Sequence, residues 1–334
     1  MGEGDGKFTM SHGLQRFYAV DPHWILHQWS TDIPGGPMTD SEFLRISTWA
    51  DGGVRDAFNL GVVGNHLEGA IASRLKSDGT QLHSTAYYNG FDKLPGQVPG
   101  NENAFTIYNM TWADLVEAPY IRYGTLDATP AMIAAGDGQH VGTAAQAIDR
   151  VISSLFFAAQ QWTDADHTLS MVTAEGPETS TKNVLGKACE IAGSCTTNFT
   201  GPVTGRTGPI VVGLPPGYAL ADNVKRDVRY PVVFALHGYG MTPQDFQALA
   251  IASTNFMNDA SKSSATRLAK FIMVYVDGRC RVQEDGWPEC ILGTFWLDSD
   301  RPNGVRMDAW FDEVVTYIDQ NYRTMPASDV DILE

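Results

Sequence analysis

The chain has few basic residues for its size and lacks any long apolar run. Among its 334 residues, 23 are Lys or Arg and 39 are Asp or Glu, which gives a formal net charge of −16. This charge excludes nucleic acid or an anionic membrane as the expected partner, because both would be repelled. The longest apolar candidate, Val151 to Ala159, is much shorter than the ~20 residues needed to span a bilayer. We therefore expect a small or neutral substrate and no membrane insertion.

The sequence also lacks the usual patterns for metals and cofactors. It contains no H-E-x-x-H, and its cysteines have no C-x-x-C spacing. The glycine-rich stretch GDGQHVG at residues 136–142 is not a dinucleotide fingerprint, because its third glycine is misplaced. We expect neither a metal nor a cofactor.

The four cysteines form two close pairs, Cys189 with Cys195 and Cys280 with Cys290. Both pairs lie in loop-like stretches that contain glycine, which predicts two short-loop disulfides. Disulfides imply an oxidising compartment, so a secreted or periplasmic protein is expected. The N-terminal residues MGEGDGKF do not have signal-peptide character, so either the leader is missing from this chain or the thiols stay reduced.

The hydrophobic fraction of 43% predicts a large core, and the two halves of the chain differ in character. The second half alternates apolar strands with a long helix, which predicts an α/β fold with a mostly parallel sheet. The first half is less regular, and a stretch rich in Thr, Gly, Ser, Asn and Pro, 175–208, separates the two. The predicted strands are 57–63, 83–88, 119–123, 210–214, 230–236 and 271–276, and the clearest helices are 67–75, 143–161 and 307–322.

The stretch Lys7 to Gly13, KFTMSHG, has the order strand, tight turn, helix. A short apolar run leads to Ser11, and an amphipathic run continues from Leu14 to Val20. A serine on such a strained strand-to-helix turn is the nucleophile of α/β-hydrolases, although Thr9 stands where that motif has glycine. The alternative is a helix N-cap, in which the Ser11 hydroxyl accepts a backbone N–H of the first turn.

Five segments between Ile210 and Thr324 follow one another in a specific order and spacing. They are IVVGLPPGY, YPVVFALHGYG, FIMVYVDGR, GTFWLDSD and WFDEVVTYIDQNYRT. Together they resemble the esterase D-like and feruloyl-esterase-like family of α/β-hydrolases, which implies a mostly parallel sheet with helices on both faces. In that family a His-Gly turn after a strand forms the oxyanion hole, which here implies the backbone around Tyr239. His237 itself is expected to be structural.

The family continues past this helix into the nucleophile strand, whereas this sequence reaches Glu334 just before such a strand. The stretch from Phe8 to Gly36 resembles that later region. We therefore expect a permuted order, which is tolerable because domain termini often lie close together. Residues 1–174 would be the nucleophile-bearing half, 175–208 a disulfide-containing linker, and 209–334 the half with the His-Gly turn. The alternative is a piece of a longer tandem chain, with Ser11 belonging to an upstream copy.

A serine nucleophile needs a histidine base and a carboxylate that orients it, in the chain order Ser, acid, His. Asp127 in GTLDATP and His140 in GDGQHVG are the predicted acid and base. Only 13 residues separate them (140 − 127), which leaves little room for the helix and strand expected between them. His167 is therefore an alternative base for Asp127, and the region of Asn65 and Glu68 an alternative source of the acid for His140.

These residues together predict a serine carboxylic-ester hydrolase that works through an acyl-enzyme. Ser11 is the predicted nucleophile, and backbone N–H groups near His12 and Tyr239 are predicted to hold the oxyanion. The expected partner is a small-molecule or polymer-linked ester, and the sequence does not determine the oligomeric state. The rival interpretation is a hydrolase-like, disulfide-stapled extracellular binding module without a working triad.

Overall fold

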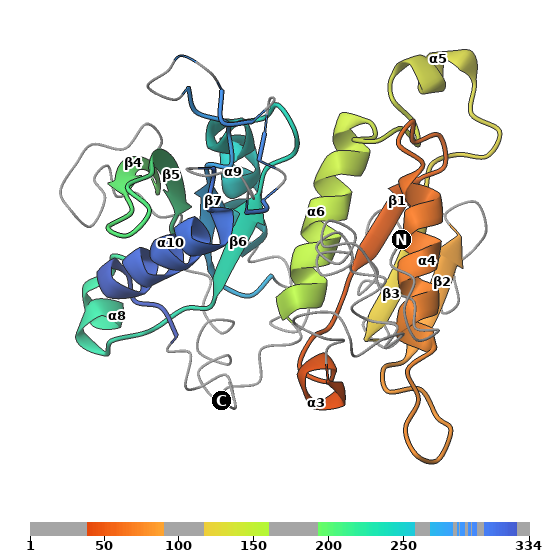
Figure 1. Ribbon diagram of the computed structural model, residues 1–334, viewed down its shortest axis with the longest axis horizontal. Coiled ribbons are helices and arrows are strands. Elements are labelled where there is room, and N and C mark those ends of the chain that lie inside the picture. Colours follow the sequence, from red (N-terminus) through yellow and green to blue (C-terminus); the bar gives the residue numbers. More distant parts are fainter. Residues whose placement is uncertain are drawn as a thin grey trace, which may run out of the picture. The chain divides into compact units, whose positions relative to one another are not determined.

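The chain forms two compact units, Met1–Gln161 and Trp162–Glu334, in the computed structural model shown in Figure 1. The structure describes residues 39–89, 117–159, 193–257, 268–282, 286, 288–290, 293–294, 296–298 and 304–325. Each unit combines helices with its own β-sheet, in agreement with the predicted α/β class. The first unit ends at Gln161, which is 13 residues before the predicted end of the first half at residue 174 (174 − 161).

The first unit contains a three-stranded parallel sheet in the order β1, β3, β2. The central strand is mostly buried, and helix α4 contacts all three strands, as Figure 1 shows. Strand β1 is Ala50–Gly53, β2 is Thr85–Asn89 and β3 is Ala118–Tyr123. The helices are α3 (Asp40–Phe43), α4 (Leu60–Ala72), α5 (Pro130–Ala134) and α6 (Ala144–Ala159).

The predicted strand at 57–63 is wrong, and the true strand precedes it. Residues 57–59 form a turn in which Asn59 has a φ of 56°, and helix α4 begins at Leu60. Strand β1 has the sequence ADGG, which lacks the β-branched and aromatic residues that identify strands. It forms because it pairs with β3 and buries Gly52 and Gly53. The predicted strands at 83–88 and 119–123 and the helix at 143–161 match β2, β3 and α6.

The second unit contains a mixed four-stranded sheet in the order β4, β5, β7, β6. β5 is antiparallel to both β4 and β7, and β7 is parallel to β6. Every residue of β7 is buried, as its uninterrupted apolar sequence predicts. The strands are β4 (Ser194–Thr200), β5 (Thr207–Gly213), β6 (Val232–Leu236) and β7 (Ile272–Val276). The helices are α8 (Ala221–Lys225), the 3-10 helix η2 (Pro243–Phe246), α9 (Gln247–Met257) and α10 (Met307–Asn321).

Strand β4 lies inside the stretch 175–208, which the sequence predicts to be a linker. Its residues SCTTNFT look loop-like because of their polarity, yet they pair with all seven residues of β5. β-propensity depends mainly on the neighbours that a strand meets, and here β5 supplies them. This part of the predicted linker therefore belongs to the sheet of the second unit.

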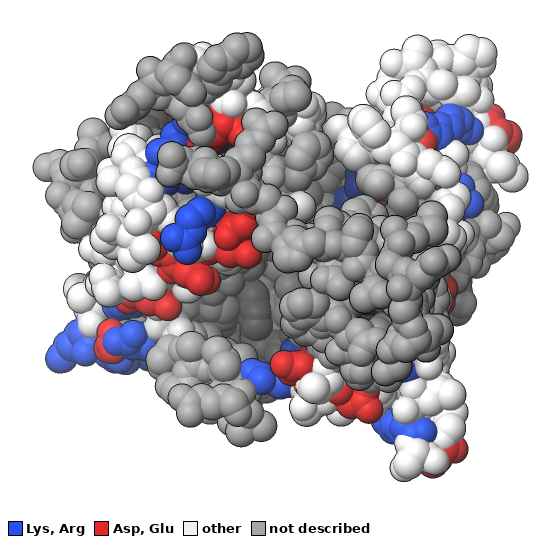
Figure 2. All heavy atoms as spheres, in the orientation of Figure 1, with Lys and Arg blue, Asp and Glu red and all other residues white. Residues whose placement is uncertain are grey.

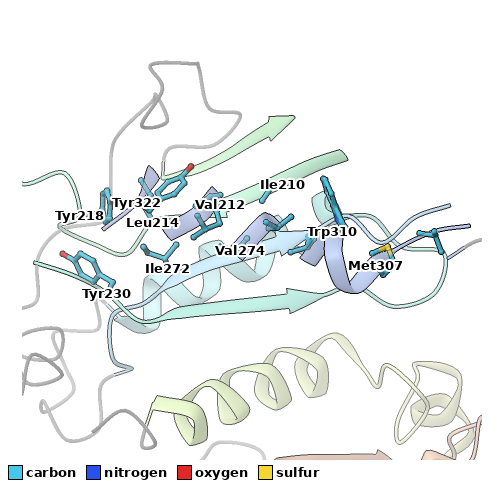
Figure 3. Close-up of a cluster of buried hydrophobic side chains, with 14 residues drawn as sticks. Ile210, Val212, Leu214, Tyr218, Tyr230, Ile272, Val274, Met307, Trp310 and Tyr322 are labelled. Atoms are coloured by element: carbon cyan, nitrogen blue, oxygen red, sulfur yellow. The ribbon is translucent and has the colours of Figure 1, made fainter. Parts of the chain in front are cut away.

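The core of the second unit is the contact between α10 and the sheet. Figure 3 shows side chains of β5, β7 and α10 meeting in one apolar cluster. Met307, Trp310, Val314 and Ile318 of α10 are buried, and their spacing of three or four residues places them on one face of the helix. Burial of apolar surface stabilises this contact by roughly 25 cal/mol per Å².

A disulfide joins Cys280 and Cys290 in the second unit, as predicted. It closes the loop that carries Glu289, whose carboxylate bonds to the buried guanidinium of Arg206 at 2.6 Å. Cys195 is disulfide-bonded as well, and its predicted partner, Cys189, lies outside the described residues. A disulfide is compatible with an oxidising, extracellular location.

We predict that Trp310→Ala destabilises the second unit by about 3–5 kcal/mol, because it removes the largest fully buried side chain of the α10 contact. Urea unfolding followed by circular dichroism measures the change. Val203→Ala, at a side chain that is 74% exposed, is the control and should have little effect. Equal losses in the two variants would contradict the proposed core.

Candidate functional site

The loops that follow β1 and β3 meet at one edge of the first unit's sheet. The two strands are parallel, with Gly53 opposite Tyr123 at their carboxyl ends. Open parallel sheets bind ligands at this edge, because the loops there bring polar side chains together. The loop after β1 carries Asp56, and the loop after β3 carries His140.

Asp56 and His140 form a hydrogen-bonded pair at this edge. His140 Nδ1 lies 3.1 Å from Asp56 Oδ2. The Asp56 side chain is only 1% exposed, whereas that of His140 is 48% exposed. An ionised carboxylate only accepts hydrogen bonds, so Nδ1 carries the proton and Nε2 is the basic nitrogen. A buried acid that fixes the tautomer of an accessible histidine is the arrangement of a general base and its orienting carboxylate.

Two further contacts hold this pair in place. The backbone N–H of Phe58 donates to Asp56 Oδ1 at 2.8 Å, so both carboxylate oxygens have partners. The Phe58 ring lies edge-on to the imidazole, with 4.9 Å between ring centroids. The imidazole is therefore fixed at one nitrogen and along one face.

The backbone of His140 is anchored from β3 and α6. The hydroxyl of Tyr123 donates to the carbonyl of His140 at 2.8 Å, and Arg150 Nη1 donates to the same carbonyl at 3.3 Å. Arg150 also pairs with Asp51 of β1 and lies over the Tyr123 ring. Burial raises the pKa of Tyr123 to about 12, so the phenol remains a donor at neutral pH.

The buried carboxylate of Asp137 joins the segments that surround the pair. Arg55 Nη1 donates to it at 3.0 Å and the backbone N–H of Thr125 at 2.8 Å. Gln146 Nε2, from α6, donates at 3.1 Å. Asp137 thus ties the loop after β1, the loop after β3 and helix α6 together, three residues before His140.

The backbones of these loops approach too closely for side chains at Gly53 and Gly138. A Cβ at Gly53 would overlap the carbonyl oxygen of Gly138, which accepts the N–H of Arg55 at 2.7 Å. Gly138 itself has a φ of 65°, a conformation that glycine adopts without strain. Both glycines are needed to bring the His140 loop onto β1.

The acid that contacts His140 is therefore Asp56, and not Asp127 or Glu68. Asp127 is exposed on the turn after β3, and no described residue bonds its carboxylate. Sequence reasoning missed Asp56 because it missed β1, and Asp56 is recognisable only as a residue that follows a strand. Ser11, His12 and His167 lie outside the described residues.

The His-Gly turn of the second unit follows β6, where the sequence predicts it. His237 is buried, and its Nε2 accepts the N–H of Gly278 at 2.8 Å. Its Nδ1 is therefore protonated and donates to the carbonyl of Gly238 at 2.9 Å. Nδ1 is used within the turn and Nε2 by the segment after β7, in agreement with a structural histidine. Tyr239, next on the chain, is 51% exposed.

A cavity of about 270 Å³ lies beside this turn within the second unit. Its wall includes Leu236, which directly precedes His237, and Trp296, whose Nε1 donates to the His237 carbonyl at 3.1 Å. Burial, together with Asp298 and Asp312, raises the pKa of Asp308 at the cavity wall. The remaining lining residues are Met307, Phe311 and Asp312.

Among the described residues, no group of three or more His, Cys, Asp or Glu side chains could hold a metal ion. In the same part of the chain no helix combines the length and apolarity that crossing a membrane requires. No protein-family model matches the chain, and no curated protein matches it either.

We predict that Gly53→Ala displaces the His140 loop and destabilises the first unit by about 1–3 kcal/mol, because the added methyl overlaps the Gly138 carbonyl. Urea unfolding measures the loss, and the NMR signal of the His140 Nδ1 proton reports the bond to Asp56. Gly69→Ala is the matched control, since a Cβ there meets nothing within 4 Å and a helical glycine weakens α4. The control should gain about 0.5–1 kcal/mol. Equal free energies of unfolding in the two variants would show that the close approach of Gly53 to the Gly138 carbonyl does not affect stability.

We predict that Asp277 contributes stability that disappears in acid. Burial raises the pKa of Asp277, but the Arg279 guanidinium, 2.7 Å away, and the Arg279 backbone N–H outweigh it and lower the pKa from 3.8 to about 2. The contribution is complete above the unfolded value of 3.8 and is lost as the pH falls through about 2. The stability difference between wild type and Asp277→Asn should therefore shrink from pH 5 to pH 2. A difference independent of pH in urea unfolding would overturn this.

Proposed function

We propose that this chain carries the catalytic groups of a serine carboxylic-ester hydrolase of the α/β-hydrolase type. The observation that carries the proposal is the hydrogen bond between buried Asp56 and accessible His140. In this assignment His140 is the general base, Asp56 orients it, and Ser11 is the nucleophile.

The position of the acid in the chain supports this assignment. Ser11, Asp56 and His140 follow the order Ser, acid, His that α/β-hydrolases use. The acid and histidine are separated by 84 residues, which accommodate α4, β2 and β3. The pair Asp127 and His140 leaves no such room.

The proposed reaction has two steps. His140 Nε2 takes the proton of the serine hydroxyl as its oxygen attacks the ester carbonyl, and then returns that proton to the leaving alcohol. The acyl-enzyme that remains is hydrolysed by a water that His140 deprotonates in the same way. Asp56 stabilises the imidazolium at both stages, and backbone N–H groups near His12 are the proposed oxyanion donors.

The proposal includes the resemblance to the esterase D-like and feruloyl-esterase-like family. The parallel pairing of β6 with β7 and the His-Gly turn at the carboxyl end of β6 support it. The permuted order of the two halves remains part of the proposal. The proposed substrate is a small-molecule or polymer-linked ester met in an oxidising compartment.

We predict that Asp56→Asn lowers kcat for p-nitrophenyl acetate by about 10²–10⁴-fold, because His140 then loses the carboxylate that holds its tautomer. Asp127→Asn is the matched comparison, since it makes the same change at the other candidate acid and should leave kcat unaltered. Circular dichroism confirms that both variants are folded. Loss of activity in Asp127→Asn alone would return the role of acid to Asp127.

A fluorophosphonate probe tests the nucleophile separately. Labelling of the wild type should disappear in Ser11→Ala and weaken in His140→Ala. Labelling that persists in Ser11→Ala would place the nucleophile on another serine. A folded wild type that neither reacts with the probe nor hydrolyses the ester would favour the binding module over the enzyme.

A further inference from the structure

Large apolar side chains are exposed around the Asp56 and His140 pair. Phe58 is 69% exposed, Leu126 71%, Val141 62% and Met132 38%. We call these four residues the apolar rim. They come from the loop after β1, the loop after β3 and helix α5.

The members of the apolar rim are tied to the catalytic pair by contacts of their own. Phe58 lies against the His140 ring, and Val141 is the next residue in the chain. The carbonyl of Leu126 accepts from Arg55, the residue before Asp56, at 3.2 Å. The carbonyl of Met132 accepts the N–H of Asp137 at 3.0 Å. Phe58 and Val141 therefore adjoin His140 directly, and Leu126 and Met132 belong to the segments that are hydrogen-bonded to Arg55 and Asp137.

Helix α5 extends the apolar character of this region. Its sequence is PAMIA, and none of its residues is buried. Figure 2 shows mainly uncharged atoms over the α5 loop, with charged side chains at its margin. A group of large exposed apolar side chains can mark a binding site, because exposing apolar surface to water is unfavourable.

The charges around the apolar rim indicate the kind of apolar ligand. The carboxylate of Asp127 is exposed between Leu126 and α5, and the chain has a net charge of −16. The exposed carboxylate and the negative net charge would both repel an anionic amphiphile. A neutral ester with an apolar acyl chain can pack against the apolar rim without this repulsion.

We propose that the apolar rim binds the acyl chain of the ester substrate, so that the site prefers medium and long acyl chains to acetate. The inference rests on the proposed esterase function, because it makes the rim part of the same site. A fully buried methylene favours binding about fourfold, so a chain lying on an open rim should raise kcat/KM about twofold to fourfold per methylene.

The first test is a chain-length series of p-nitrophenyl esters, from acetate to octanoate, on the full chain. In the wild type kcat/KM should rise with length, and Leu126→Ser and Val141→Ser should flatten that rise. Val203→Ser changes a valine of the second unit that is 74% exposed, and it should keep the wild-type slope. Hydrolysis without length dependence would overturn the inference and leave the proposed function standing.

A binding measurement keeps the inference testable if the chain hydrolyses no ester. Equilibrium dialysis with radiolabelled 1-butanol and 1-dodecanol, which are neutral and cannot be hydrolysed, measures the apolar site directly. Tighter binding of 1-dodecanol that is lost in Leu126→Ser and Val141→Ser, and retained in Val203→Ser, supports the rim even without hydrolysis. Binding that does not depend on chain length, or that survives in both rim variants, overturns it.

Discussion

The site of the first unit depends on the hydrogen bonds that the buried carboxylate of Asp137 accepts. Its partners Arg55, Thr125 and Gln146 come from three segments, of which that of Arg55 lies 82 residues away in the sequence. A buried charge that lost these donors would cost several kcal/mol, so the three segments stay together. His140 lies three residues further along the same loop, and its position follows from this network.

The second unit is stabilised mainly by apolar packing. Its sheet and α10 enclose an apolar cluster in which Trp310 is fully buried, and the charged residues act at the edge of that cluster. Arg206 pairs with Glu289 on the loop that the Cys280–Cys290 disulfide closes. The disulfide therefore helps to keep a buried ion pair assembled, while the apolar cluster holds the sheet.

The sequence predicts the elements whose apolar pattern is long and continuous. Strands β5 and β7 and helices α6 and α10 are confirmed, because their buried faces leave a readable apolar pattern. Strand β6 is confirmed by its apolar run VVFAL, although none of its residues is fully buried. The sequence does not predict strands β1 and β4, because their residues, ADGG and SCTTNFT, carry little apolar signal. These two strands form because β3 and β5 offer them backbone partners, and a partner strand is not visible in local sequence.

By itself the sequence determined the α/β class, the position of the His-Gly turn, the Cys280–Cys290 disulfide and the choice of His140 as a candidate base. Only the tertiary structure decided which carboxylate His140 meets. Asp127 is near it in the chain, yet it remains exposed on its turn, whereas Asp56 is 84 residues away and lies 3.1 Å from the imidazole. The reason is physical, because the parallel pairing of β1 and β3 brings their carboxyl ends to one edge, and no spacing along the chain encodes that meeting.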